Sequence, residues 1–182
     1  TLVFTGAMDY WPNIDAVTWF AREIFPKLRE REPNLHFYIV GSSPASSVTQ
    51  LESLPGVIVT GRVKDVRPYL QHALVAVAPM RIARGVQNKV LEAMAMERPV
   101  IVSDKGLEGI DAVHGEQVLL AKSADDYLSC LEEVFRGDHP CIGERARRWI
   151  VERFNWDENL PEVVYLLDGE DCSSSEEKTA IA

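Results

Sequence analysis

Residues 73–96 contain, in order, an apolar run that ends at Ala78, the basic loop Pro79-Met-Arg-Ile-Ala-Arg-Gly-Val-Gln87 and the segment Asn88-Lys-Val-Leu-Glu-Ala-Met-Ala-Met96. The apolar run predicts a buried strand, and the apolar spacing from residue 87 to residue 96 predicts an amphipathic helix. A strand, a short loop and a helix in succession are typical of an α/β fold with a parallel sheet.

The same stretch predicts an anion site. Lys89 and Glu92 are three residues apart, on one face of the expected helix, and Arg81, Arg84 and Gly85 lie in the loop before it. Free N–H groups and the dipole at a helix N-terminus favour phosphate, and a carboxylate one turn further can accept hydrogen bonds from sugar hydroxyls. These residues together indicate a nucleotide or a nucleotide-sugar ligand.

The rest of the chain repeats the alternation of strands and helices. Apolar runs predict strands at residues 2–5, 35–40, 57–60, 73–78, 100–103 and 118–121. Helical spacing predicts helices at residues 13–31, 45–54, 66–72, 87–96, 124–136, 143–153 and 156–167, and Pro26 should kink the first of them or end it early. We therefore expect a Rossmann-like, doubly wound parallel sheet of about six strands.

A length of 182 residues suits one domain with a full core. We expect a single domain over residues 1–167 and an acidic tail over residues 168–182 that is disordered from Gly169. The chain begins directly with a strand and without a start methionine, so we expect it to be a piece of a longer protein.

The charge is negative overall but locally basic. A net charge of −9 argues against a nucleic-acid partner, whereas residues 60–100 hold seven Lys and Arg against three Asp and Glu. Such a basic segment would concentrate anions at one place. Three widely spaced cysteines without metal-ligand spacing indicate reduced thiols in a cytosolic protein, and no apolar run reaches the length of a membrane span.

Several common chemistries are absent from the sequence. Gly6, Gly41 and Gly61 end strands, where glycine lets the backbone approach a ligand, but no P-loop and no Gly-x-Gly-x-x-Gly fingerprint occurs. The histidines lack metal-ligand spacing, and no nucleophile–base pair can be assigned. The residues therefore predict a binding site with no metal ligands and no assignable catalytic residue.

The motifs resemble the C-terminal half of a GT-B glycosyltransferase of family 4, as found in bacterial exopolysaccharide-associated sugar transferases. The resemblance covers nearly all of the chain to about Leu167. It rests on Phe4-Thr-Gly-Ala-Met-Asp-Tyr-Trp-Pro-Asn13, Ile39-Val-Gly41, Val59-Thr-Gly-Arg-Val-Lys-Asp65, Arg81-Ile-Ala-Arg-Gly-Val-Gln-Asn-Lys-Val-Leu-Glu-Ala-Met-Ala95 and Pro99-Val-Ile-Val-Ser103.

The resemblance implies that this half holds the sugar donor, a UDP-sugar or GDP-sugar. Glu92 would bind the ribose, Lys89 and Arg81 would neutralise the diphosphate, and the backbone around Arg62 and Val63 would contact the base. Gly6 and Gly85 would complete the donor site. The family's first glutamate corresponds to Arg84 here, and its Gly-Arg…Lys-Gly phosphate segment is missing. Arg84 would then serve a phosphate, and more of the diphosphate charge would fall on the cations of residues 81–89.

The resemblance further implies a hexosyltransferase that retains configuration and uses no cofactor and no protein-bound metal. The acceptor would bind a missing N-terminal domain, so this piece alone would be inactive. The enzyme would be cytoplasmic, and this assignment allows peripheral association of the full-length protein with the inner face of the membrane. Two alternatives stay open: a nucleotide-sugar 2-epimerase and a non-catalytic nucleotide-binding module.

Overall fold

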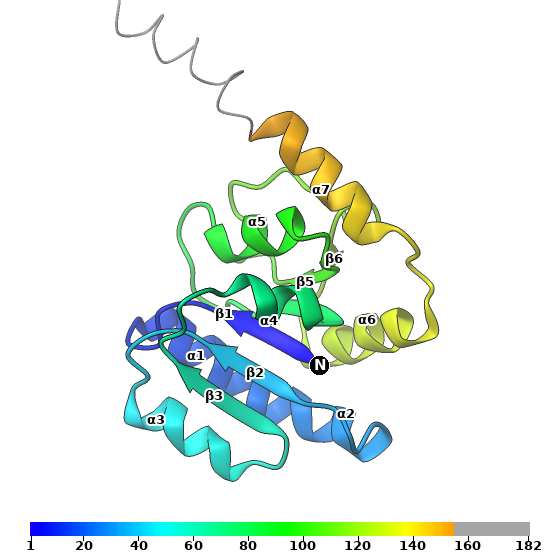
Figure 1. Ribbon diagram of the computed structural model, residues 1–182. Coiled ribbons are helices and arrows are strands. Elements are labelled where there is room, and N and C mark those ends of the chain that lie inside the picture. The colour runs from blue at the N-terminus through cyan, green and yellow to red at the C-terminus, as the bar shows by residue number, and fades with distance from the viewer. Residues whose placement is uncertain (155–182) are drawn as a thin grey trace, which may run out of the picture.

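A computed structural model describes residues 1–154 of the chain (Figure 1). Its centre is one sheet of six strands in the order β3-β2-β1-β4-β5-β6, and every neighbouring pair is parallel. The strands are β1 (Leu2–Thr5), β2 (Phe37–Val40), β3 (Val57–Gly61), β4 (Val75–Ala78), β5 (Val100–Val102) and β6 (Leu119–Leu120). This is the strand order of the Rossmann fold, so the expected fold class is confirmed.

Helices connect the strands on both faces of the sheet. They are α1 (Trp11–Trp19), α2 (Phe25–Arg31), α3 (Ser46–Thr49), α4 (Arg67–His72), α5 (Asn88–Ala95), α6 (Ala124–Arg136) and α7 (Ile142–Arg153). A 3-10 turn, Gln50–Ser53, follows α3. Across residues 1–154, no helix combines the length and apolar character that a bilayer crossing requires.

The first helix does not end early at Pro26. A π-helical turn, Phe20–Ile24, joins α1 to α2, and the helical path continues to Arg31. Pro26 falls in the first turn of α2, just after the π-helical turn. Proline is tolerated at this position because an N–H there would have no acceptor within α2. The expected helix at residues 156–167 and the expected tail at residues 168–182 lie outside the described residues.

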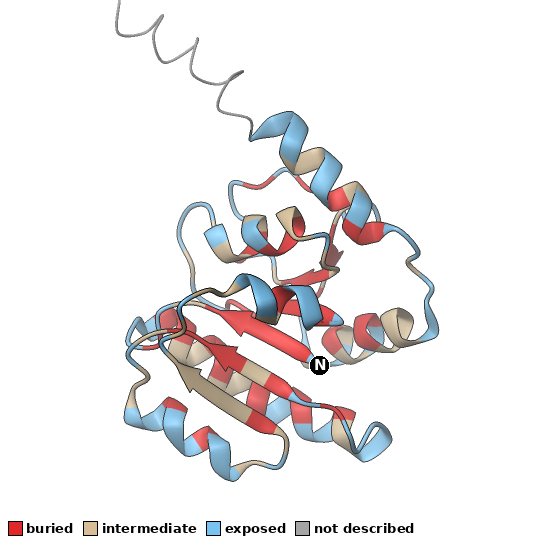
Figure 2. Ribbon diagram, in the orientation of Figure 1, coloured by how far each residue is buried: buried red, intermediate tan, exposed pale blue. Residues whose placement is uncertain are grey.

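The inner strands of the sheet are buried on both faces, and β1 is buried along its whole length, whereas the edge strand β3 is mostly half-buried (Figure 2). One core lies between the sheet and α1, α2 and α6, where Phe20, Phe37 and Tyr127 pack together. A second core lies under α4, α5 and α7. The apolar runs lack alternation for this reason, because neighbouring residues of a strand both face helices.

The ends of β1 and β2 approach each other closely at two glycines. The Gly6 N–H donates to the Val40 carbonyl oxygen at 3.0 Å, and a Cβ on Gly41 would lie 1.6 Å from the Gly6 carbonyl oxygen. No side chain at position 41 could avoid this backbone contact. The glycine at 41 thus fixes the position of the loop that follows β1.

Candidate functional site

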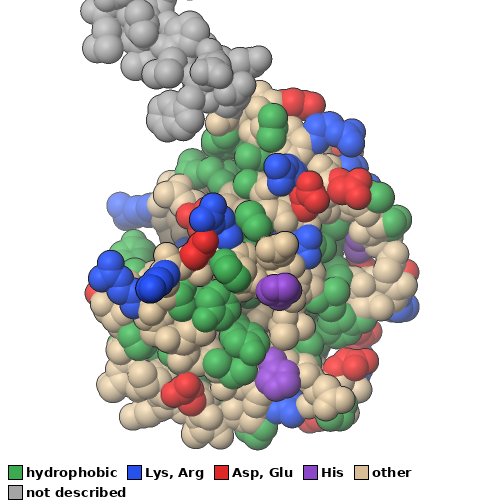
Figure 3. Space-filling view, viewed as in Figure 1, with side chains coloured by type: hydrophobic (Ala, Val, Ile, Leu, Met, Phe, Trp, Pro, Cys, Tyr) green, Lys and Arg blue, Asp and Glu red, His purple; other side chains and the backbone are tan. Residues whose placement is uncertain are grey.

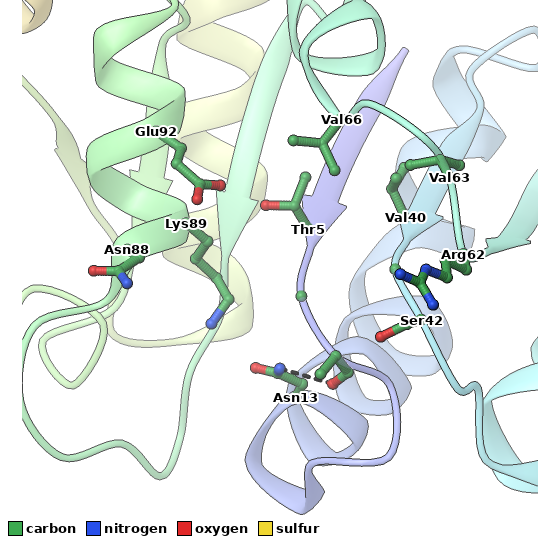
Figure 4. A pocket seen from close by; sticks show the side chains of 13 residues that line it. Thr5, Asn13, Val40, Ser42, Arg62, Val63, Val66, Asn88, Lys89 and Glu92 are labelled. Carbon is green, nitrogen blue, oxygen red and sulfur yellow. Dashed lines mark hydrogen bonds between the residues drawn. The ribbon is translucent and has the colours of Figure 1, made fainter.

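A cavity of about 480 Å³ lies at the carboxyl edge of the sheet (Figure 4). It is lined by the ends of β1 and β2, the loop after β3 and the start of α5: Thr5, Gly6, Ala7, Asn13, Val40, Gly41, Ser42, Arg62, Val63, Val66, Asn88, Lys89 and Glu92. Its volume lies within the range of about 300–1,000 Å³ typical of small-molecule sites. In open α/β sheets, ligands bind at this edge.

Helix α5 begins at the wall of this cavity without a capping side chain. Gln87 precedes the helix in an extended conformation, and its side chain donates instead to the Gly85 carbonyl oxygen at 3.0 Å. The first N–H groups of a helix have no partner within the helix. The start of α5 therefore offers N–H donors and the positive end of its dipole to a ligand in the cavity.

Lys89 extends from the first turn of α5 into the cavity. Its Nζ donates to Gln87 Oε1 at 3.2 Å and lies 5.3 Å from the centre of the Phe4 ring. Burial lowers the pKa of Lys89, and the nearby Glu92 carboxylate opposes this shift. An anion in the cavity would stabilise the ammonium, because it would replace part of the hydration lost on burial.

Glu92 lies one turn after Lys89, on the same side of α5. Burial raises the pKa of its carboxyl group, and the Lys89 ammonium acts in the opposite direction. In Figure 4 the Glu92 carboxylate and the Thr5 hydroxyl point toward one another across the cavity. The expected placement of Lys89 and Glu92 on one face is therefore confirmed, and both line the cavity.

The opposite wall comes from the loop after β3. Arg62 is exposed, whereas Val63 and Val66 are partly buried against the core under α4. These two valines give that side of the cavity an apolar surface, beside the backbone expected to contact a base. The structure thus brings five of the eight predicted site residues to one cavity: Gly6, Arg62, Val63, Lys89 and Glu92.

The structure places the other three predicted residues away from the cavity lining. Arg81 Nε donates to Asp15 Oδ2 at 2.9 Å, and its guanidinium lies 5.6 Å from the centre of the Trp19 ring. Hydrogen bonding to Asp15 raises the pKa of Arg81. Arg84 and Gly85 lie in the exposed loop before α5, where Gly85 has a φ of +69°. A diphosphate-binding role for these residues stays a prediction.

Four residues of the cavity lining with polar side chains were not predicted from the sequence: Thr5, Asn13, Ser42 and Asn88. Thr5 and Ser42 could have been found, because each lies beside a glycine at the carboxyl end of a strand. Asn88 could have been found from its place at the start of α5. Asn13 could not, because it enters the cavity only through the path of the loop between β1 and α1.

Basic side chains gather at this edge of the molecule. On the face shown in Figure 3, Lys and Arg side chains cluster at the left, the side toward which the strand arrows of Figure 1 point. Part of the basic segment is neutralised within the described residues, since Arg67 pairs with Asp65 and Arg81 pairs with Asp15. Arg62 and Lys89 remain as the cations of the cavity wall.

Several solved structures share this architecture. Anabaena HepE, in complex with UDP and glucose, matches with a TM-score of 0.72 and 14% identity over 93% of this chain and 48% of its own. Sucrose-phosphate synthase from Thermosynechococcus elongatus matches with a TM-score of 0.71 and 20% identity over 92% of this chain and 44% of its own. At these identities the matches establish the fold.

Two further findings complete the comparison. The chain spans about half the length of the structures it matches, and no curated protein matches its sequence. The sequence profile of the family described as glycosyl transferases group 1 matches residues 1–136, most of the chain. The chain therefore belongs to the group 1 glycosyltransferases.

Proposed function

We propose that this chain is the donor-binding half of a retaining glycosyltransferase of family 4 and that the cavity at the start of α5 binds a nucleoside diphosphate sugar. The observation that carries the proposal is the joint placement of Lys89 and Glu92 in one cavity, at an uncapped helix N-terminus. A cation and free N–H groups suit a diphosphate, and a carboxylate suits a ribose diol.

The ligand's orientation follows from the two walls. The ribose would lie against Glu92 and the diphosphate against Lys89 and the start of α5. The base would then contact the backbone at Arg62 and Val63 and the apolar surface of Val66. The leaving diphosphate gains negative charge during transfer, so cations already in position would stabilise the transition state. Arg84, in the exposed loop before α5, would approach the diphosphate or the sugar.

The activity of the whole protein is part of this proposal. The chain spans about half of HepE, a structure solved with UDP and glucose, which supports a second, acceptor-binding domain in the full protein. We propose transfer of a hexose in exopolysaccharide synthesis without a protein-bound metal or a cofactor. The motifs shared with exopolysaccharide-associated transferases support this. The proposed setting is the cytoplasm, an assignment that allows peripheral association of the full-length protein with the inner face of the membrane.

Calorimetry of the chain with UDP, GDP and ADP, and with their glucose conjugates, tests donor binding. We expect weak but saturable binding of one nucleoside diphosphate and of its sugar conjugate, and no sugar transfer by residues 1–182 alone. The same transfer assay on the full-length protein should show turnover. Efficient transfer by residues 1–182 alone would contradict the two-domain part of the proposal, and no binding of any of the nucleotides would contradict the donor site.

Replacement of Glu92 by alanine should weaken nucleotide binding by about 1–3 kcal/mol, the scale of a hydrogen bond to a charged group. Glu92 is exposed and belongs to neither core, so the fold should be kept. Calorimetry with UDP and with 2′-deoxy-UDP separates the roles, since the loss should be smaller for the deoxy ligand. Glu108→Ala, at an exposed carboxylate outside the cavity, is the control. Equal losses for both ligands would remove Glu92 from the ribose.

A further inference from the structure

The loop between β1 and α1 is held rigidly at the base of the cavity. The Met8 N–H donates to the Ser42 carbonyl oxygen at 2.8 Å, and Asn13 Nδ2 donates to the Ala7 carbonyl oxygen at 2.9 Å. Asn13 lies in the first turn of α1 and is only 4% exposed. Its carboxamide is thus fixed in place before any ligand arrives.

The orientation of this carboxamide is determined by its partner. A carbonyl oxygen accepts but cannot donate, so the Asn13 atom that faces Ala7 must be the nitrogen. The oxygen, Oδ1, then faces away from Ala7; it is buried and has no hydrogen-bond partner among the described residues. A buried acceptor without a partner is rare in native proteins and calls for an explanation.

Lys89 carries a donor on a side chain that packs over the same glycine as Asn13. A Cβ on Gly6 would meet Asn13 Nδ2 at 2.7 Å and Lys89 Cε at 3.4 Å, so both side chains pack over the same glycine. Figure 4 shows the Lys89 amine directed from α5 toward the Asn13 carboxamide. The absence of a side chain at Gly6 is what allows the two to approach.

The Lys89 ammonium has N–H groups that are not used in hydrogen bonds among the described residues. It carries three N–H groups, and within residues 1–154 it has one hydrogen-bond acceptor, Gln87 Oε1 at 3.2 Å. Burial also lowers the pKa of Lys89, so the charged form gains from each further acceptor. An uncharged oxygen suits this place, because a carboxylate would repel the phosphate groups expected next to Lys89.

We propose that Asn13 is a positioning residue: a rotation of the Lys89 side chain brings its ammonium to the Asn13 oxygen, which accepts a hydrogen bond from it and holds that ammonium in the cavity, against a bound diphosphate. The inference rests on the proposed donor site and adds a residue from the first turn of α1 to it. Asn13 then acts on the ligand only through Lys89. Asn13 would thus aid phosphate binding indirectly, whereas a phosphate-binding segment after β1 would contact the phosphate itself.

A double-mutant cycle tests the coupling. UDP affinities are measured by calorimetry for the wild type, Asn13→Ala, Lys89→Met and the double variant. Asn13→Ala should weaken UDP binding about tenfold in the wild-type background, the scale of one hydrogen bond to a charged group, and change it less than twofold when Lys89 is already methionine. Asn88→Ala, at an exposed residue of the same cavity wall, is the matched control and should give additive effects.

The titration of Lys89 gives a second readout that a merely structural role would not move. With ¹³C-labelled lysine, the Lys89 Cε signal is assigned by its loss in Lys89→Met. Its pKa should fall in Asn13→Ala, which lacks the acceptor, and rise in Asn13→Asp, which places a carboxylate there. Glu92 faces the same ammonium and is unchanged in both variants.

The outcomes separate this inference from the donor site. If the wild type binds UDP but the two substitutions are additive and the Lys89 pKa is unmoved, Asn13 does not position Lys89, and the donor site stands. If the wild type binds no nucleotide, the donor site fails, and the NMR titration still decides whether Asn13 contacts Lys89. If Asn13→Ala does not fold, Asn13→Asp provides the titration.

Discussion

Substitution of Gly41 by alanine is expected to destabilise the fold by about 3–5 kcal/mol, near the upper end of single-residue effects. The added Cβ would lie 1.6 Å from the Gly6 carbonyl oxygen and 2.7 Å from the Gly6 carbonyl carbon. Backbone atoms cannot rotate away as a side chain can, so β1 and β2 must separate at the edge of the cavity. Thermal and urea unfolding of the purified variant measure the loss.

Gly115→Ala is the matched control for this substitution. Gly115 has a φ of +79°, and a Cβ there would meet no atom within 4 Å. Its replacement should cost only about 1–2 kcal/mol, the penalty of left-handed backbone for alanine. A Gly41→Ala variant as stable as Gly115→Ala would show that the ends of β1 and β2 are not packed as described.

Replacement of Lys89 by methionine should reduce the affinity for UDP by about 2–3 kcal/mol, or roughly 30- to 150-fold. The affinity for uridine should change little, because the lost interaction is with phosphate. Methionine keeps most of the apolar stem of Lys89, so the fold should be kept. Lys64→Met, at an exposed lysine of the same basic segment outside the cavity lining, is the control.

The affinity for UDP should also depend on pH through Lys89. Burial lowers the pKa of Lys89 in the free protein. A diphosphate bound beside the ammonium, as proposed, would raise that pKa. Above the free-protein pKa, binding must therefore take up a proton, so the wild-type affinity for UDP should fall as the pH rises through that value. Lys89→Met should lack this fall. Calorimetry from neutral to alkaline pH measures it, and an identical fall in both proteins would assign the titration to another group.

The sheet could be predicted because its signal is local. Runs of Val and Ile bounded by glycine or proline are typical of parallel strands, and all six expected strands are present, although four are shorter by one or two residues. The behaviour at Pro26 could not be predicted in the same way. A π-helical turn is set by how the helix packs on the sheet, and no short sequence pattern indicates it.

In the candidate site, too, local features could be predicted from the sequence and long-range contacts could not. Lys89 and Glu92 were predictable because the spacing of three residues within one helix fixes their relative position. The ion pair that holds Arg81 away from the cavity lining could not be predicted, because its partner Asp15 lies 66 residues earlier and meets it only in the folded chain. Asn13 was missed for the same reason, since it comes near Lys89 only where the starts of α1 and α5 meet at Gly6 in the folded chain.

A titration of the ¹⁵N-labelled chain with UDP, followed by the backbone amide signals, tests the central claim most directly. If the nucleotide binds as proposed, the amides of Gly6, Val63, Asn88 and Lys89 should shift together and saturate at one dissociation constant. Those around a second cavity near the start of β1, lined by Tyr38, Pro68, Tyr69 and His72 among others, should not move. Saturable shifts around the second cavity, with the α5 amides unmoved, would contradict the account.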